Sequence, residues 1–360
     1  MRLMSMRAVR VVAATAVACV AALSACTVGQ RSPASVPAGV SLPLPGGMPG
    51  HYVVVAGREV VVRASGDGHV TGSVAIPGPA GTSLSPVAGE PSGSADGRNF
   101  VIVVSRGGDL PGVADVTLFR LAVSPGGQPE ELRQLNFGNR GVPVTGAALS
   151  PDGRMLALSL VHEFPGGPLY GSVEVINVAS GVTRAWTGRS APGYWPGVPS
   201  WASASTVVVP WWHSASQGML PARLTGIRHL DAAASGGSLA ARLVAFPAPV
   251  PGLQSALITP GGGEVIASSC RARHHTATAR VIELSAADGR LVRMLRTQTA
   301  RFGNDADAQD AIASTCQVLS VADDGGQVLV QAFAFGRIDN GAFASLPGTT
   351  SRVLPVSAAW

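Results

Sequence analysis

The sequence predicts an all-β protein, a β-propeller of six four-stranded blades whose ring is closed by the C-terminal strand. Three observations predict this fold: a turn motif that recurs along the chain, a hairpin that recurs with it, and a strand-like tail after the last hairpin. No convincing amphipathic helix interrupts the short apolar runs. Blades that close into a ring remove the exposed strand edges that an open sheet would leave.

The clearest copy of the repeat runs from Thr145 to Trp186 and is typical of four short strands. A turn at Ser150–Gly153 separates the first two strands, and a second turn at Ala179–Gly181 separates the last two. Asp and Gly favour such turns because Gly tolerates positive φ and the Asp side chain bonds its own backbone. The first turn recurs before other apolar runs, at Ser94–Arg98, Thr259–Gly263, Ala322–Gly326 and, more weakly, Ala202–Ser205. Copies lie roughly 50 to 60 residues apart, at the long end of the range for propeller blades.

The hairpin of the third and fourth strands appears in six copies, and this number predicts six blades. The copies begin at Glu59, Val116, Val173, Gly226, Arg280 and Gly336. A seven-bladed ring is the alternative, if one long interval contains a degenerate blade. The first blade begins at His51 without an inner strand before it, so we expect the tail Ser351–Trp360 to supply that strand. Val353, Leu354 and Val356 give the tail its strand character.

One blade motif carries a family resemblance. Ser150-Pro151-Asp152-Gly153-Arg154, followed by the apolar run MLALSL, resembles the blade signature of TolB-like and related bacterial WD-type β-propellers. The resemblance extends over about residues 51–360, although only the third blade matches well. It implies the propeller fold and a habit of binding proteins, and it supplies no catalytic residues.

The first 25 residues are predicted to be a signal peptide. Three arginines precede an apolar run of 13 residues, Val11–Leu23, which is too short for an ordinary membrane span. The run ends in Leu23-Ser24-Ala25-Cys26, which resembles the bacterial lipobox, so lipidation is expected at Cys26. The protein is then expected on the outer face of the cytoplasmic membrane, anchored by lipid. Ordinary secretion and a retained N-terminal anchor are the alternatives.

Residues 26–50 are rich in Pro, Gly and Ser and are predicted to form a flexible tether between the lipidated Cys26 and the propeller at residues 51–360. Removing residues 1–25 takes away three Arg, so the remaining 23 Arg and 21 acidic residues give a net charge of +2. No block of Arg is interleaved with aromatic residues, so nucleic-acid binding is not expected.

Two cysteines remain in the predicted propeller, Cys270 and Cys316. An exported protein lies where disulfides persist, and neighbouring blades would bring the two together. We therefore predict a disulfide between them. Two buried free thiols are the alternative.

The positions of the long loops predict which face of the ring is the binding surface. The connections from the second to the third strand of a blade, and from one blade to the next, are long and share one face, and function concentrates in such loops. Trp, Tyr and Arg are common anchors of binding surfaces. The residues expected to bind a partner there are His162, Tyr194, Trp195, Trp211, Trp212, His213, Arg271 and His274. The alternative for Trp195, Trp201 and Trp211 is that they pack between blades.

Metal, cofactor and catalytic sites are not predicted. Asp305, Asp307 and Asp310 offer carboxylates for Ca²⁺, but Asp310 and Cys316 stand where an EF-hand loop needs Gly and Glu. His274 and His275 are adjacent, so on a strand they would point to opposite faces and only in a loop could they converge as ligands. No G-x-S-x-G nucleophile motif occurs. The expected function is binding of an envelope protein or glycan. The alternatives are a propeller enzyme of lactonase or glycosidase type and a structural subunit of an envelope complex.

Overall fold

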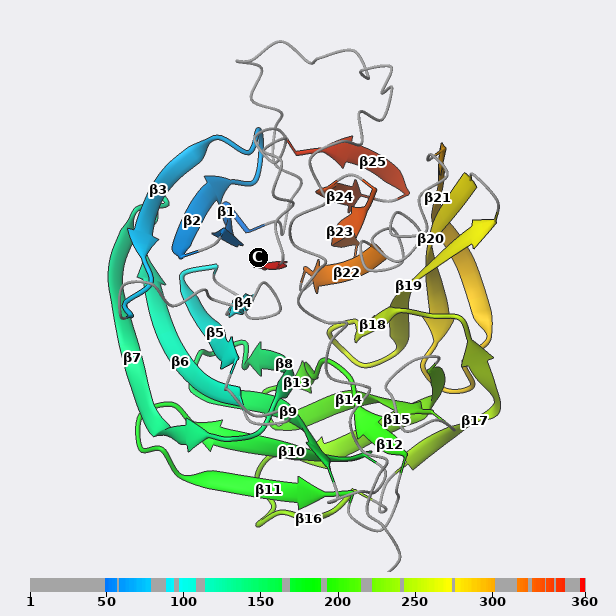
Figure 1. The fold of residues 1–360 in the computed structure, drawn as a ribbon, viewed down its shortest axis with the longest axis horizontal. Helices are drawn as coiled ribbons and strands as arrows, with labels where there is room; N and C mark the ends of the chain where they lie inside the picture. Colours follow the sequence, from blue (N-terminus) through cyan, green and yellow to red (C-terminus); the bar gives the residue numbers. More distant parts are fainter. Residues whose placement is uncertain are drawn as a thin grey trace, which may run out of the picture.

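The described residues of the computed structural model are built from strands that surround a common centre (Figure 1). The described residues are 49–56, 58–78, 89–93, 97–107, 114–163, 169–188, 193–214, 222–239, 243–273, 276–301, 316–322, 326–333, 335–339, 341–346 and 357–359. In this part of the chain the elements are all strands, which confirms the predicted all-β class. No helix within these ranges is long and apolar enough to cross a membrane.

The strands of the first half of the ring pair mostly antiparallel with their neighbours. They are β1 (His51–Ala56), β2 (Glu59–Ala64), β3 (Val70–Ala75), β4 (Gly89–Gly93), β5 (Asn99–Gly107), β6 (Ala114–Val123), β7 (Pro129–Arg140), β8 (Val144–Leu149), β9 (Met155–Glu163), β10 (Leu169–Asn177), β11 (Thr183–Thr187) and β12 (Tyr194–Pro196).

The strands of the second half also pair mostly antiparallel with their neighbours. They are β13 (Ser200–Ser203), β14 (Thr206–His213), β15 (Arg223–Asp231), β16 (Gly237–Ser238), β17 (Leu243–Pro251), β18 (Ser255–Ile258), β19 (Glu264–Arg273), β20 (Thr276–Ser285), β21 (Leu291–Arg301), β22 (Cys316–Val321), β23 (Gln327–Ala332), β24 (Phe335–Asp339), β25 (Ala342–Ser345) and β26 (Ser357–Ala359).

Strand pairing groups these strands into blades around the ring. Four separate four-stranded sheets form blade 1 (β26-β1-β2-β3), blade 2 (β4 to β7), blade 5 (β18 to β21) and blade 6 (β22 to β25). A ten-stranded sheet contains blade 3 (β8 to β11) and blade 4 (β13, β14, β15 and β17), because β12 pairs with both β10 and β14 and joins them. The described strands therefore form six four-stranded units, whose outer strands are β3, β7, β11, β17, β21 and β25, and the short strand β16 pairs with β11 on its outer side (Figure 1).

The repeated turn has the local chemistry that its sequence predicts. The Asp152 Oδ1 atom accepts a hydrogen bond from the Arg154 N–H, and the Ser150 Oγ atom accepts one from the Met155 N–H. Gly153 has a φ of 69°, in the left-handed region that Gly adopts without strain. In the weaker copy the Ser203 Oγ atom accepts the Thr206 N–H instead. The Ser150 hydroxyl also donates to the Asp152 Oδ1 atom over 2.7 Å. This bond is the main reason why the pKa of the Asp152 carboxyl is lowered, and the bond from the Arg154 N–H acts in the same direction.

The C-terminal strand closes the ring, as the sequence predicts. The strand β26 pairs antiparallel with β1, with Val53 opposite Ala359 and Val55 opposite Ser357. It occupies the innermost position of blade 1, near the centre of the ring (Figure 1). Val353, Leu354 and Val356, which gave the tail its strand character, lie outside the described residues.

Large core clusters lie between neighbouring blades, because successive side chains of a strand point to opposite faces. In β1, Val53 and Val55 pack with blade 2, whereas Tyr52 and Val54 pack with blade 6. Each blade thus buries both of its faces, and long apolar runs such as FVIVV in β5 replace the alternation expected of a half-exposed sheet. Ala358 of β26 belongs to the cluster between blades 1 and 6.

Blades 5 and 6 are also joined covalently. A disulfide connects Cys270 of β19 with Cys316 at the start of β22, with 5.9 Å between their Cα atoms, and this confirms the predicted pair. The Ser268 hydroxyl donates to the Cys316 carbonyl over 2.8 Å, and the Ser255 Oγ atom accepts from the Val318 N–H over 2.7 Å. A bridge with a sequence separation of 46 residues constrains the unfolded chain by on the order of 4 kcal/mol.

Deleting residues 357–360 is expected to lower the free energy of unfolding by about 2–4 kcal/mol, because β1 loses its backbone partners and the cluster with Tyr52 and Val54 loses Ala358. Urea denaturation of the full and truncated chains measures the difference. The truncated chain should also aggregate more readily, because β1 becomes an exposed edge. An unchanged denaturation midpoint would contradict a closing role for β26.

Candidate functional site

On one face of the ring, the second strand of each blade ends and the third strand begins. In blade 3 the last pair of β9 and β10 on this face is Glu163 with Leu169, and in blade 5 the last pair of β19 and β20 is Arg273 with Thr276. The short turns, such as the one at Asp152, lie at the opposite ends of the strands. We call the first side the long-loop face. Most of the connecting residues on it lie outside the described ranges, so its strand ends define the site.

The tryptophans predicted as anchors on this face are buried, so that prediction is wrong. Trp195, Trp211 and Trp212 expose 4%, 1% and 6% of their surface. Successive side chains of β14 point to opposite faces, but both faces are covered, and all residues from Val207 to Trp212 are buried. The alternative, packing between blades, describes their position. The prediction assigned these residues to loops, whereas Trp211 and Trp212 lie at the end of β14 and Trp195 lies on β12.

The buried tryptophans connect blade 4 to its neighbours on both sides. Trp211 and Trp201 pack in the cluster between blades 3 and 4, and the Trp201 Nε1–H group donates to the Ala148 carbonyl of blade 3 over 3.0 Å. Trp195 and Trp212 pack in the cluster that reaches blade 5. The Arg228 guanidinium lies 4.7 Å from the centre of the Trp211 ring, and burial lowers its pKa to about 10. These side chains stabilise the ring and are not available to a partner.

A row of half-buried rings crosses the joined blades 3 and 4 on the long-loop face. His162, Tyr170, Tyr194 and His213 are successive cross-strand partners on β9, β10, β12 and β14. His162 stacks on Tyr170 with 4.7 Å between ring centres, and Tyr194 lies 4.3 Å from His213. The structure therefore brings together three of the predicted site residues, His162, Tyr194 and His213.

Replacing Trp212 by Ala is expected to lower the free energy of unfolding by about 3–5 kcal/mol, because it leaves a cavity in the cluster between blades 4 and 5. Urea denaturation measures the change. Arg223→Ala, at an exposed position of the adjoining strand, serves as the control and should stay within about 0.5 kcal/mol of the parent. If both variants denature like the parent, the indole does not support the core.

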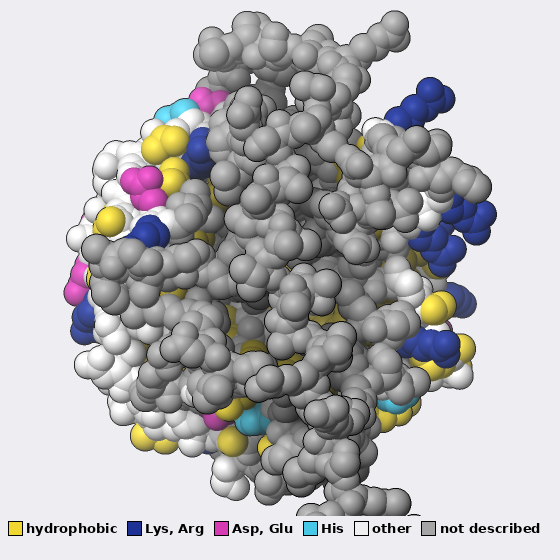
Figure 2. Space-filling model, viewed as in Figure 1, with side chains coloured by type: hydrophobic (Ala, Val, Ile, Leu, Met, Phe, Trp, Pro, Cys, Tyr) yellow, Lys and Arg dark blue, Asp and Glu magenta, His cyan; other side chains and the backbone are white. Residues whose placement is uncertain are grey.

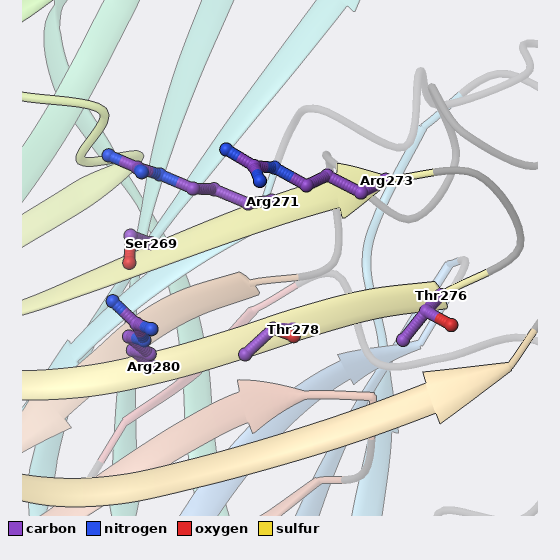
Figure 3. A pocket seen from close by; sticks show the side chains of 6 residues that line it. All are labelled: Ser269, Arg271, Arg273, Thr276, Thr278 and Arg280. Carbon is purple, nitrogen blue, oxygen red and sulfur yellow. The ribbon is translucent and has the colours of Figure 1, made fainter.

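A separate feature of the same face is a hollow of about 410 Å³ on blade 5, which we call the arginine pocket. Its lining consists of side chains from one face of the β19–β20 hairpin, namely Ser269, Arg271, Arg273, Thr276, Thr278 and Arg280. In Figure 3 the side chains of Arg271 and Arg273 extend from the same side of β19, and the side chain of Arg280 points from β20 toward Ser269. Arg271 also approaches the β17–β18 connection, because a Cβ on Gly252 would lie 3.4 Å from its Nη2 atom.

Strand alternation explains how the pocket is formed. Arg271 and Arg273 are two residues apart, so they share a face of β19, whereas Cys270 points to the other face and bonds to blade 6. On β20, Ala277 and Ala279 are buried while Thr276, Thr278 and Arg280 are not. One face of the hairpin therefore anchors it to blade 6, and the other presents cations and hydroxyls.

The three guanidinium groups have no carboxylate partner among the described residues. The ion pairs in this part of the chain join other residues, such as Arg293 with the buried Glu283 over 2.6 Å. Residues 264–301 contain seven Arg and three acidic residues, a net charge of +4. Figure 2 shows Lys and Arg side chains gathered at the right of the view, where Figure 1 places β19 to β21. The chain has no Lys, so these cations are arginines.

Sequence reasoning identified only Arg271 of this pocket as a binding residue. Arg273, Arg280 and the three hydroxyl residues lie on strands, whereas the predicted binding residues were assigned to loops. The alternating pattern of Ser269, Arg271 and Arg273, followed by Thr276, Thr278 and Arg280, is the signal that identifies one polar strand face. His274 lies outside the described residues.

The described residues contain no group of three or more His, Cys, Asp or Glu side chains that would hold a metal ion. The carboxylates considered for Ca²⁺, Asp305, Asp307 and Asp310, lie outside the described ranges.

Comparison with known proteins adds information about the fold. No family model and no curated protein matches the chain. Similar solved structures include a TolB from Agrobacterium tumefaciens that is 14% identical in sequence. The match covers 72% of this chain and 83% of the TolB chain, with a TM-score of 0.41. An oligogalacturonate lyase from Vibrio parahaemolyticus is 12% identical, with 84% and 76% coverage and a TM-score of 0.44.

A third similar structure is the β-propeller domain of the Trilobed protease from Pyrococcus furiosus, 7% identical, with 73% coverage of both chains and a TM-score of 0.36. These neighbours include both enzymes and TolB, so they do not separate an enzyme from a binding protein. The chain has a β-propeller fold, similar to that of TolB and other propeller proteins.

Proposed function

We propose that this chain is a lipid-anchored extracytoplasmic β-propeller that binds an anionic envelope partner through the arginine pocket on its long-loop face. The observation that carries the proposal is a set of three arginines on one face of the β19–β20 hairpin, Arg271, Arg273 and Arg280. They have no carboxylate partner among the described residues. Planar guanidinium groups bind carboxylate and phosphate with two parallel hydrogen bonds each.

Electrostatics supports an anionic partner over a neutral one. The predicted mature chain carries a net charge of only +2, yet residues 264–301 alone carry +4. The cations are therefore concentrated on blade 5. A local positive potential raises the association rate of an oppositely charged partner.

The scaffold supports binding because the pocket lies on strands and not on loops. The β19–β20 hairpin is held to blade 6 by the disulfide and by the Ser268–Cys316 hydrogen bond. A rigid hairpin loses little conformational entropy when it binds. The lipid on Cys26 would keep this surface close to other components of the envelope.

Photo-crosslinking in intact cells tests the binding surface. A benzoylphenylalanine in place of Thr278 should give a discrete adduct, identified by mass spectrometry, because Thr278 lines the pocket. The same substitution at the exposed Ser180, on the short-turn face, is the matched control and should give none. Arg271→Gln combined with Arg273→Gln should remove the adduct. Adducts from position 180 alone would show that the opposite face binds the partner.

Cys26→Ala is expected to move the protein from the membrane fraction to the soluble fraction, because the thiol that would take the lipid is gone. Fractionation with immunodetection measures the distribution, and labelling with a palmitate analogue should mark the parent chain and not the variant. A parent chain without label would refute lipid anchoring and leave the proposal for the pocket to stand on its own test.

A further inference from the structure

We propose that the arginine pocket recognises an extended acidic peptide segment whose carboxylates fall on alternate residues. This inference rests on the proposed function and specifies the chemistry of the partner. It follows from the strand register of the β19–β20 hairpin, which arranges the lining residues in three regular steps.

Each step of the pocket consists of one arginine and one hydroxyl residue on opposite strands. The register pairs Ser269 with Arg280, Arg271 with Thr278, and Arg273 with Thr276. All six side chains are on one face, because the pairs are separated by two residues along each strand. We call these pairs the three rungs of the pocket.

The spacing of the rungs matches that of an extended polypeptide. Two residues of a β-strand advance about 6.7 Å, so the three rungs extend over about 13 Å. A peptide in extended conformation places every second side chain on one face at the same interval. Three acidic residues at alternate positions would therefore each face one rung in register.

Each rung has the groups that such a residue needs. A guanidinium group donates two parallel hydrogen bonds to one carboxylate. The hydroxyl of Ser269, Thr278 or Thr276 both donates and accepts, so it can bond the second lone pair of the carboxylate or a backbone group of the peptide. The three arginines are exposed and form no ion pair with a described carboxylate, so they do not have to break such a pair before they bind.

The same register disfavours an anionic glycan as the ligand. The charges of a glycan repeat with the length of its sugar unit, which has no relation to the two-residue step of a strand. Half-buried rings do occur on this face, but they belong to β9, β10, β12 and β14, whereas the pocket is formed by β19 and β20. An oligouronate is therefore the competitor to include in the test.

The test measures binding of three labelled peptides of ten residues to the full chain in detergent by fluorescence anisotropy. One peptide has glutamate at three alternate positions, the second has the same composition with the three glutamates adjacent, and the third has glutamine at the alternate positions. The alternating peptide should bind at least about tenfold more tightly than each of the others, which corresponds to about 1.4 kcal/mol. Its affinity should fall as salt is raised.

Variants of the pocket assign the binding to the rungs. Arg271→Gln combined with Arg273→Gln should weaken the alternating peptide at least about tenfold, because two charge-assisted pairs are lost. Arg133→Gln, at an exposed position of β7 on blade 2, removes one cation elsewhere and should leave the affinity unchanged. Thermal denaturation of each variant verifies that the fold is retained.

The outcomes separate this inference from the proposed function. Equal affinity for the alternating and adjacent peptides, or competition by an oligouronate at lower concentration than by the alternating peptide, would overturn the peptide assignment. The crosslink from position 278 would still stand in that case, and with it the binding surface. Loss of both the crosslink and peptide binding would refute the pocket as a binding site.

Discussion

The packing of each blade against two neighbours is the constraint on which the rest of the structure depends. A four-stranded sheet with apolar residues on both faces is stable only when both faces are covered, and the ring achieves this through clusters that lie between consecutive blades. Ring closure belongs to the same constraint, because Tyr52 and Val54 of blade 1 need the partners that blade 6 and β26 provide. The short strand β26 thus contributes out of proportion to its length, since it completes a cluster and protects the edge of β1.

This constraint explains which sequence-based predictions were correct. The turn at Ser150–Gly153 and its copies depend on local chemistry, so the fold class and the blade repeat could be predicted from residues a few positions apart. The disulfide between Cys270 and Cys316 followed from the order of the blades. The burial of Trp211 and Trp212 could not be decided in this way, because it comes from clusters that include residues of the neighbouring blades. Those contacts join residues far apart in the sequence, and no local pattern encodes them.

The arginine pocket could be predicted in part from the sequence, for a different reason. Its alternating pattern is local, so the polar face of β19 and β20 could be recognised from sequence once both segments were taken as strands. What sequence could not supply is the register of the hairpin, which decides that Arg280 lies beside Ser269 and so adds a third cation to the two on β19. It also could not show that Glu283 is engaged by Arg293 on the neighbouring strand and is therefore not a partner for the pocket.

Three positive charges on one face of the β19–β20 hairpin would be expected to destabilise it. The energies of repulsion and of the disulfide show why the fold tolerates these charges. Two cations about 7 Å apart in water repel by about 0.6 kcal/mol, and salt reduces this further. The disulfide behind them contributes on the order of 4 kcal/mol, and Ala279 packs with Cys316 and Ala332 of blade 6 at the back of the hairpin. The clamp on one face therefore outweighs the repulsion on the other. A bound anion would relieve that repulsion as well as form hydrogen bonds with arginines that have no carboxylate partner among the described residues. The same hairpin is therefore held covalently to blade 6 on one face and charged on the other, which is the arrangement that the proposed binding requires.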